Sequence, residues 1–335
     1  MIELKILRAL LLDDEDIAIE VTKNYGILKC INLISKSKIK NNFLRLLRNL
    51  DESIDQSITN VENKYLKLVN DAKNLSINLS ASGINHIFFK GVPLSSLFYK
   101  FPVDRNLNDF DILIDTGDIK KFYEFLGKNS LKHRGNYKYL DRFGYTRTAL
   151  EVVKSNNGYV YDFHHRIISK IFSNQCPITH LALEDKDNIK GLSIPSKNIL
   201  LITSMYHCFK QNNSYFNPQI FLDIHHLTKS NFDEREVMKH LKKLKLDSYF
   251  KKLLFFKELI MSGDESEEIK RFSKSIFIKE RKSKSIFTNS IFLKSQFAHL
   301  FDPEPYINYA GGNTKNNKFI ELVKMKTQRK KIRNL

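Results

Sequence analysis

Two aspartates in the segment Asp109-Phe110-Asp111 are spaced so that both could bind a metal ion from one side of a β-strand. Successive side chains of a strand point to opposite faces, so Asp109 and Asp111 point one way and Phe110 points the other way. Carboxylate oxygens are the ligands that Mg²⁺ and Mn²⁺ prefer, and a few of them suffice because the ion keeps several waters. The pair therefore predicts a Mg²⁺ or Mn²⁺ centre on an otherwise apolar strand.

A third carboxylate is expected on a neighbouring strand, and Asp162 is the best candidate. It stands among aromatic and β-branched residues in Tyr159-Val160-Tyr161-Asp162-Phe163. An unpaired charge is costly in such surroundings unless a cation meets it. Asp109, Asp111 and Asp162 are thus the predicted catalytic and metal-binding residues.

Residues that suit phosphate binding precede the aspartate pair. The glycine of the step Lys90-Gly91 allows close approach of the backbone, and the helix expected after it offers free N–H groups. Lys90 adds a mobile charge, Arg105 could bind phosphate bidentately, and Ser95 could donate a hydroxyl. Phosphoryl and nucleotidyl transfer depend on positioning and charge neutralisation by such groups.

The elements that must hold these residues are short strands between helical regions. Periodicity and turn residues predict strands at 84–89, 107–114, 148–153 and 158–164, and a short helix at 92–99. Helical spacing dominates before and after this part. We expect an α+β fold, with a small mixed sheet flanked by N-terminal and C-terminal helical regions. The expected parts are residues 1–82, the core 83–195, the helices 196–262, and a basic Lys/Ser/Phe-rich region 263–335 ending in a mobile tail.

The amino-acid composition narrows the classes of binding partner and the cellular compartment that we expect for the protein. The 335 residues carry 55 Lys and Arg against 37 Asp and Glu, a net charge of +18 that favours phosphorylated partners and leaves nucleic acid open as one of them. The three cysteines are far apart and form no zinc or disulfide pattern, which suits a reducing compartment. No apolar run reaches the ~20 residues that a membrane span needs. We expect a cytoplasmic protein without a membrane partner.

The order of these motifs resembles the DNA-polymerase-β-like nucleotidyltransferase superfamily. More narrowly, it resembles a poorly characterised bacterial nucleotidyltransferase family, in which a Lys-Gly turn, an Arg, an Asp-x-Asp strand and an Asp-x-His strand follow one another. Lys90-Gly91, Arg105, Asp109 with Asp111, and Asp162 with His164 match these features over about residues 60–230. From the residues alone, His164 and His165 suggest a hydrogen-bonded pair. The resemblance places His164 in the nucleotide site.

The resemblance implies metal-dependent transfer of a nucleoside monophosphate from a nucleoside triphosphate (NTP) to an acceptor, with release of pyrophosphate. The acceptor stays open among a natural product, a peptide, a protein and an RNA. One alternative is a nucleic-acid-binding protein with structural acids, which predicts salt-sensitive RNA or DNA binding. Another is a catalytically degenerate transferase fold that serves as an interaction or antitoxin-like module, which predicts no NTP binding.

Overall fold

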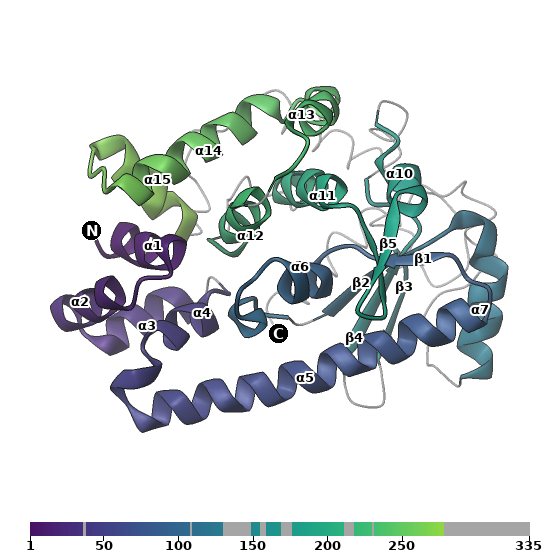
Figure 1. Cartoon of the computed structure of the whole chain (residues 1–335), viewed down its shortest axis with the longest axis horizontal. Helices are drawn as coiled ribbons and strands as arrows, with labels where there is room; N and C mark the ends of the chain where they lie inside the picture. The colour runs from purple at the N-terminus through teal and green to yellow at the C-terminus, as the bar shows by residue number, and fades with distance from the viewer. Residues whose placement is uncertain are drawn as a thin grey trace, which may run out of the picture.

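A mixed four-stranded sheet lies at the centre of the fold, with helices against both of its faces (Figure 1). The strands are β1 (His86–Phe88), β2 (Asp109–Ile114), β3 (Ala149–Lys154) and β4 (Val160–His164), in the order β1-β2-β4-β3. The computed structural model describes residues 1–35, 38–107, 109–129, 149–154, 159–168, 176–210, 218–229 and 231–277. The predicted α+β class with a mixed sheet is confirmed.

The pairing of β2 with β4 is the central feature of this sheet. These two strands run parallel and in register, with Asp111 opposite Asp162. The pairs β1–β2 and β3–β4 are antiparallel. The turn predicted at 155–158 lies outside the described residues.

Alternation along the strands divides their side chains between two hydrophobic clusters. Phe110, Ile112 and Phe163 face α5 (Glu52–Ala81) and α7 (Ile119–Lys128), where the rings of Phe122 and Phe163 lie 4.7 Å apart. Ile87, Phe89 and Leu113 belong to the other cluster, together with helices from both ends of the described chain. Because side chains alternate, Asp111 and Asp162 share this second face.

The N-terminal region is helical, as the spacing of apolar residues predicts. It comprises α1 (Ile2–Leu12), α2 (Glu15–Tyr25), α3 (Ile27–Ser35), α4 (Lys40–Leu46), the 3₁₀ turn η1 (Arg48–Leu50) and α5. Aspartates begin two of these helices: the carboxylates of Asp14 and Asp51 accept hydrogen bonds from the backbone N–H groups of Ile17 and Ser53. In Figure 1 the long helix α5 runs from the N-terminal helices to the sheet, which it reaches with its C-terminal part.

Short elements connect the strands and carry several site residues. Helix α6 (Gly91–Leu97) follows β1, the 3₁₀ turn η2 (Pro102–Asp104) precedes β2, and η3 (Thr116–Asp118) leads into α7. After β4 come α10 (Ile178–Glu184) and an antiparallel pair, β5 (Lys186–Ile189) with β6 (Leu192–Pro195).

The C-terminal helices return to the N-terminal ones. They are α11 (Lys197–Lys210), α12 (Pro218–Lys229), α13 (Glu234–Lys243), α14 (Asp247–Ser262) and α15 (Glu267–Phe277). Helix α1 packs against α12, α14 and α15, and one hydrophobic cluster runs through both helical regions. No described helix is long and apolar enough to cross a membrane. The expected division at residues 82, 195 and 262 stays a prediction, and the basic tail lies beyond the described part of the chain.

Candidate active site

Asp111, Asp162 and His164 form the one cluster among the described residues that could hold a metal ion. Each offers a ligand atom, and these atoms all lie within 4.8 Å of one another. The parallel register brings Asp111 beside Asp162, and His164 lies two residues further along β4 on the same face. The Nε2 atom of His164 lies 3.2 Å from Asp111 Oδ1 and 3.3 Å from Asp162 Oδ2. The sheet thus places two of the three predicted acids side by side.

Asp109 stands at the solvent-exposed start of β2, outside this cluster of three. The protein atoms around it and the charge of Asp111 both raise its pKa, although Lys90 and Lys38 act in the opposite direction. A cation bound between the carboxylates of Asp109 and Asp111 would relieve their mutual repulsion. The negative charge of the cluster therefore acts on Asp109, although Asp109 is not one of its three members.

Lys90 neutralises Asp111. It lies at the junction of β1 and α6, and its Nζ is 2.5 Å from Asp111 Oδ1. Burial alone would raise the pKa of Asp111, but the charge of Lys90 and the hydrogen bond from His164 lower it far below the usual range. Burial lowers the pKa of His164, whereas its hydrogen bonds with Asp111 and Asp162 raise it more, so the net shift is upward. Asp111 is therefore an ionised carboxylate.

A cation fits this cluster because one of its buried carboxylate oxygens has no partner. Among the described residues, Asp162 Oδ1 has no hydrogen bond. A buried carboxylate oxygen without a partner is costly. Oxygen ligands suit Mg²⁺ and Mn²⁺, while an imidazole ligand suits transition metals better. The sequence predicted that His164 contacts the nucleotide. The structure instead places it among the potential metal ligands, because the register of β2 and β4 brings it close to Asp111.

Arg105 lies beside Gly91 but is tied to a residue that sequence reasoning missed. Its Nε and Nη2 donate to Asp223 Oδ1 and Oδ2 at 2.8 and 3.0 Å. Its third nitrogen, Nη1, would lie 3.3 Å from a Cβ atom added to Gly91. Asp223 is a lone acid in the buried run Phe221–His225 of α12, and an acid in such a run needs a cationic partner. This lone acid in an apolar run was the sequence feature that could have identified Asp223 as the partner of a buried cation.

Ser95, the remaining predicted residue, is fully buried in α6. Its hydroxyl donates to the Val92 carbonyl at 3.0 Å and lies 3.2 Å from the Tyr65 hydroxyl. The hydroxyl is therefore satisfied within the fold. Its role in nucleotide binding stays a prediction.

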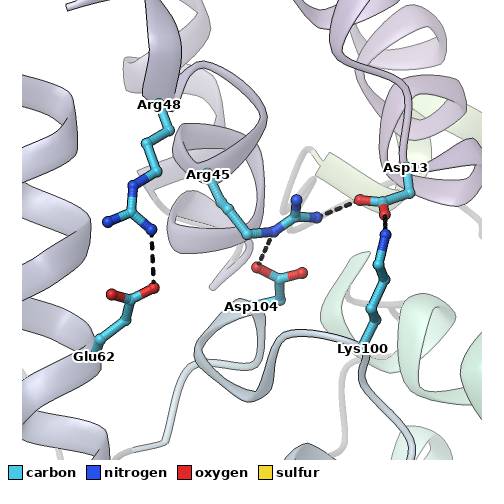
Figure 2. Close-up of polar contacts among 6 residues, drawn as sticks. All are labelled: Asp13, Arg45, Arg48, Glu62, Lys100 and Asp104. Atoms are coloured by element: carbon cyan, nitrogen blue, oxygen red, sulfur yellow. Dashed lines mark hydrogen bonds and ion pairs between the residues drawn. The ribbon is translucent and has the colours of Figure 1, made fainter.

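The turn before β2 is also held by the N-terminal helices. Arg45 in α4 donates from Nε to Asp104 Oδ1 at 2.7 Å, and it also pairs with Asp13 at the end of α1 (Figure 2). Lys100 lies on the other side of Asp13, with its Nζ 3.3 Å from Oδ2. Asp104 and Arg105 are adjacent in sequence, so two helical regions hold neighbouring residues of one turn.

Comparison with known proteins assigns the family. Residues 30–262 match the family described as uncharacterised nucleotidyltransferase, and the chain belongs to this family. No curated protein matches. One solved structure, titled an antigenic nucleotidyltransferase-like protein from Paracoccidioides brasiliensis, matches with 15% identity over 66% of this chain and 96% of that chain. Its TM-score of 0.35 is too low to carry an argument about this chain.

Proposed function

We propose that this protein is a divalent-metal-dependent nucleotidyltransferase, which transfers a nucleoside monophosphate from an NTP to an acceptor and releases pyrophosphate. The observation that carries the proposal is the alignment of Asp111 with Asp162 on adjacent parallel strands, with an unpaired buried oxygen on Asp162. Membership in a nucleotidyltransferase family supports the same chemistry. Mg²⁺ and Mn²⁺ are the proposed cofactors, since carboxylates dominate the donor set.

Each residue has a proposed task. Asp109, Asp111 and Asp162 would hold the cation, which would supply positive charge to offset that of the triphosphate. Asp162 also orients the attacking group of the acceptor and accepts its proton. His164 donates a hydrogen bond that fixes the two carboxylates of Asp111 and Asp162 relative to each other.

Lys90 and Arg105 supply the positive charge on the phosphate side. Lys90 is paired with Asp111, and on NTP binding it exchanges this carboxylate for a phosphate oxygen, because its ammonium group is a mobile point charge. Glycine at position 91 lets the side chains of Arg105 and Leu107 pack directly on the backbone, and this close packing places the Arg105 guanidinium at the Lys90-Gly91 turn. The acceptor class is not fixed by these residues: a natural product, a peptide, a protein and an RNA all offer a suitable nucleophile.

Label transfer tests the proposal. The protein is incubated with each of the four α-³²P-labelled NTPs and Mg²⁺ or Mn²⁺, with and without cell extract. We expect label on an acceptor with the wild type and none with the Asp109→Asn/Asp111→Asn variant. Asp187→Asn is the matched control, because Asp187 is an exposed strand aspartate in β5, outside the site. Transfer that survives the double substitution would refute the metal-dependent mechanism.

A further inference from the structure

Asp223 holds Arg105 in one orientation through a buried network. The side chains of Asp223 and Arg105 are only 3% and 13% exposed, and two parallel hydrogen bonds join them. Asp223 Oδ1 also accepts from the Tyr99 hydroxyl at 2.8 Å, and the Tyr99 oxygen accepts from Gln219 Nε2 at 2.8 Å. The carboxylate is thus fixed by donors from Arg105 and Tyr99, both between α6 and β2, and Gln219 of α12 in turn holds the Tyr99 hydroxyl.

A guanidinium held at two nitrogens has no rotational freedom left at the third, because the group is planar and rigid. In Arg105 the third nitrogen is Nη1, which has no hydrogen-bond partner among the described residues. It lies against Gly91, where an added Cβ atom would be 3.3 Å away. Burial lowers the pKa of Arg105, but the charge of Asp223 and the hydrogen bonds to it raise the pKa more. The group stays charged.

We propose that Asp223 is a positioning residue for nucleotide binding: it fixes Arg105 so that Nη1, which packs against the Gly91 backbone, is presented to an NTP phosphate at the Lys90-Gly91 turn. This inference rests on the proposed function and deepens it. It replaces the bidentate phosphate contact expected from sequence with a single-point contact, because Nε and Nη2 are committed to Asp223. It also makes α12, far along the chain from the catalytic strands, a necessary part of the site.

A double-mutant cycle tests the inference. Dissociation constants for a non-hydrolysable α,β-methylene NTP with Mg²⁺ are measured by calorimetry for the wild type, Arg105→Ala, Asp223→Asn and the double variant. We expect Asp223→Asn to weaken binding about 10- to 100-fold, the effect of misplacing a charged hydrogen-bond donor. In the Arg105→Ala background the same substitution should change binding by less than about threefold, because Asp223 acts through Arg105.

Asp118→Asn is the matched control, because Asp118 is likewise an aspartate paired with a cation, Lys121, but lies at the start of α7, outside the network that holds Arg105. We expect it to change NTP binding by less than about threefold. Thermal unfolding is measured in parallel. If Asp223→Asn does not fold, Asp223→Glu takes its place in the cycle with the same expectation, because it keeps the charge and displaces the carboxylate by one methylene.

The outcomes separate the two proposals. The positioning role is refuted if the Asp223→Asn variant binds the NTP as tightly as the wild type does. It is also refuted if the substitution weakens binding equally with and without Arg105. Neither result contradicts the proposed function. A merely structural role would lower the melting temperature and the active fraction but leave the dissociation constant of the folded protein unchanged. A wild type that binds none of the four analogues overturns the proposed function and this inference together.

Discussion

Replacing Arg45 with Met removes the cation that faces the buried carboxylate of Asp104. The two side chains are 10% and 6% exposed, and the Nε–Oδ1 distance is 2.7 Å. Removing one partner of a buried ion pair costs about 3–5 kcal/mol when the other partner stays charged. Asp104 can escape that cost by taking up a proton. The destabilisation must therefore depend on pH.

The sign follows from the pKa of Asp104. Burial raises this pKa to about 7, although Arg45 favours the ionised form. In the unfolded chain an aspartate has a pKa of about 3.9. Between these two values the folded protein holds the proton and the unfolded chain does not, so the free energy of unfolding falls as the pH rises from about 4 to about 7. Above that range the wild-type carboxylate is ionised beside Arg45 and contributes no further slope.

The Arg45→Met variant should lose stability beyond pH 7, where the wild type does not. Without the cation, burial keeps the carboxyl group protonated, and each further pH unit costs about 1.4 kcal/mol. We expect an extra loss of about 3 kcal/mol at pH 9 relative to pH 6, capped by the cost of burying the bare charge. A pH-independent loss adds to this, because Arg45 also stacks 4.1 Å from the ring centroid of Phe101.

Urea unfolding at pH 6, 7, 8 and 9 measures this difference. Arg48→Met is the matched control: Arg48 pairs with Asp55 at the surface, and 36% of its side chain is exposed. It also pairs with Glu62 (Figure 2). We expect this substitution to leave the free energy of unfolding nearly unchanged at every pH, because exposed ion pairs are screened by solvent. Adding Asp104→Asn to Arg45→Met should abolish the slope. Equal destabilisation by Arg45→Met at pH 6 and pH 9 would refute the reasoning.

Substitutions at three further positions test the site. Asp109→Asn should raise the free energy of unfolding slightly and strongly lower the transfer rate, because it removes repulsion with Asp111 together with a metal ligand. A variant as active as the wild type would exclude Asp109 from the site. Gly91→Ala should lower the transfer rate about 10²-fold, because its Cβ would meet Leu107 Cδ2 at 2.9 Å and Arg105 Nη1 at 3.3 Å; unchanged single-turnover rates would contradict this. Lys90→Met should raise KM for the NTP about tenfold, and Lys90→Arg should restore part of the loss in steady-state assays.

Local chemistry along the chain accounts for what the sequence could predict. The shared face of Asp109 and Asp111 follows from strand alternation, and the Lys90-Gly91 step falls between a strand and a helix because both flanking runs are apolar. The predicted strands overlap all four strands of the central sheet, and β3 runs one residue past its predicted end, to Lys154. These features depend only on residues that are close in the sequence, so the spacing of apolar residues is enough to predict them.

Contacts between distant residues were beyond the same reasoning. Arg105 and Asp223 are 118 residues apart, and Arg45 and Asp104 are 59 apart. No local pattern states which buried acid will meet which cation, because the pairing is decided by how helices pack on the sheet. Ser95 shows a different difficulty, which arises from a contact close in sequence. Its hydroxyl donates to a carbonyl three residues earlier, and this local hydrogen bond competes with any bond to a ligand.

The order of charges in the turn before β2 specifies where the two helical regions are placed. Asp104 meets Arg45 of α4, and Arg105 meets Asp223 of α12. If the regions exchanged places, Asp104 would face Asp223 and Arg105 would face Arg45, which would bury two pairs of like charges. Burying two pairs of like charges would destabilise the exchanged arrangement by several kcal/mol. Two apolar contacts at these positions would not distinguish the two arrangements. Buried ion pairs are weak evidence for stability, but here adjacent residues of opposite sign distinguish the correct assembly from its inverse. The same assembly sets Arg105 beside Gly91, so the specificity of folding and the geometry of the phosphate site depend on one turn.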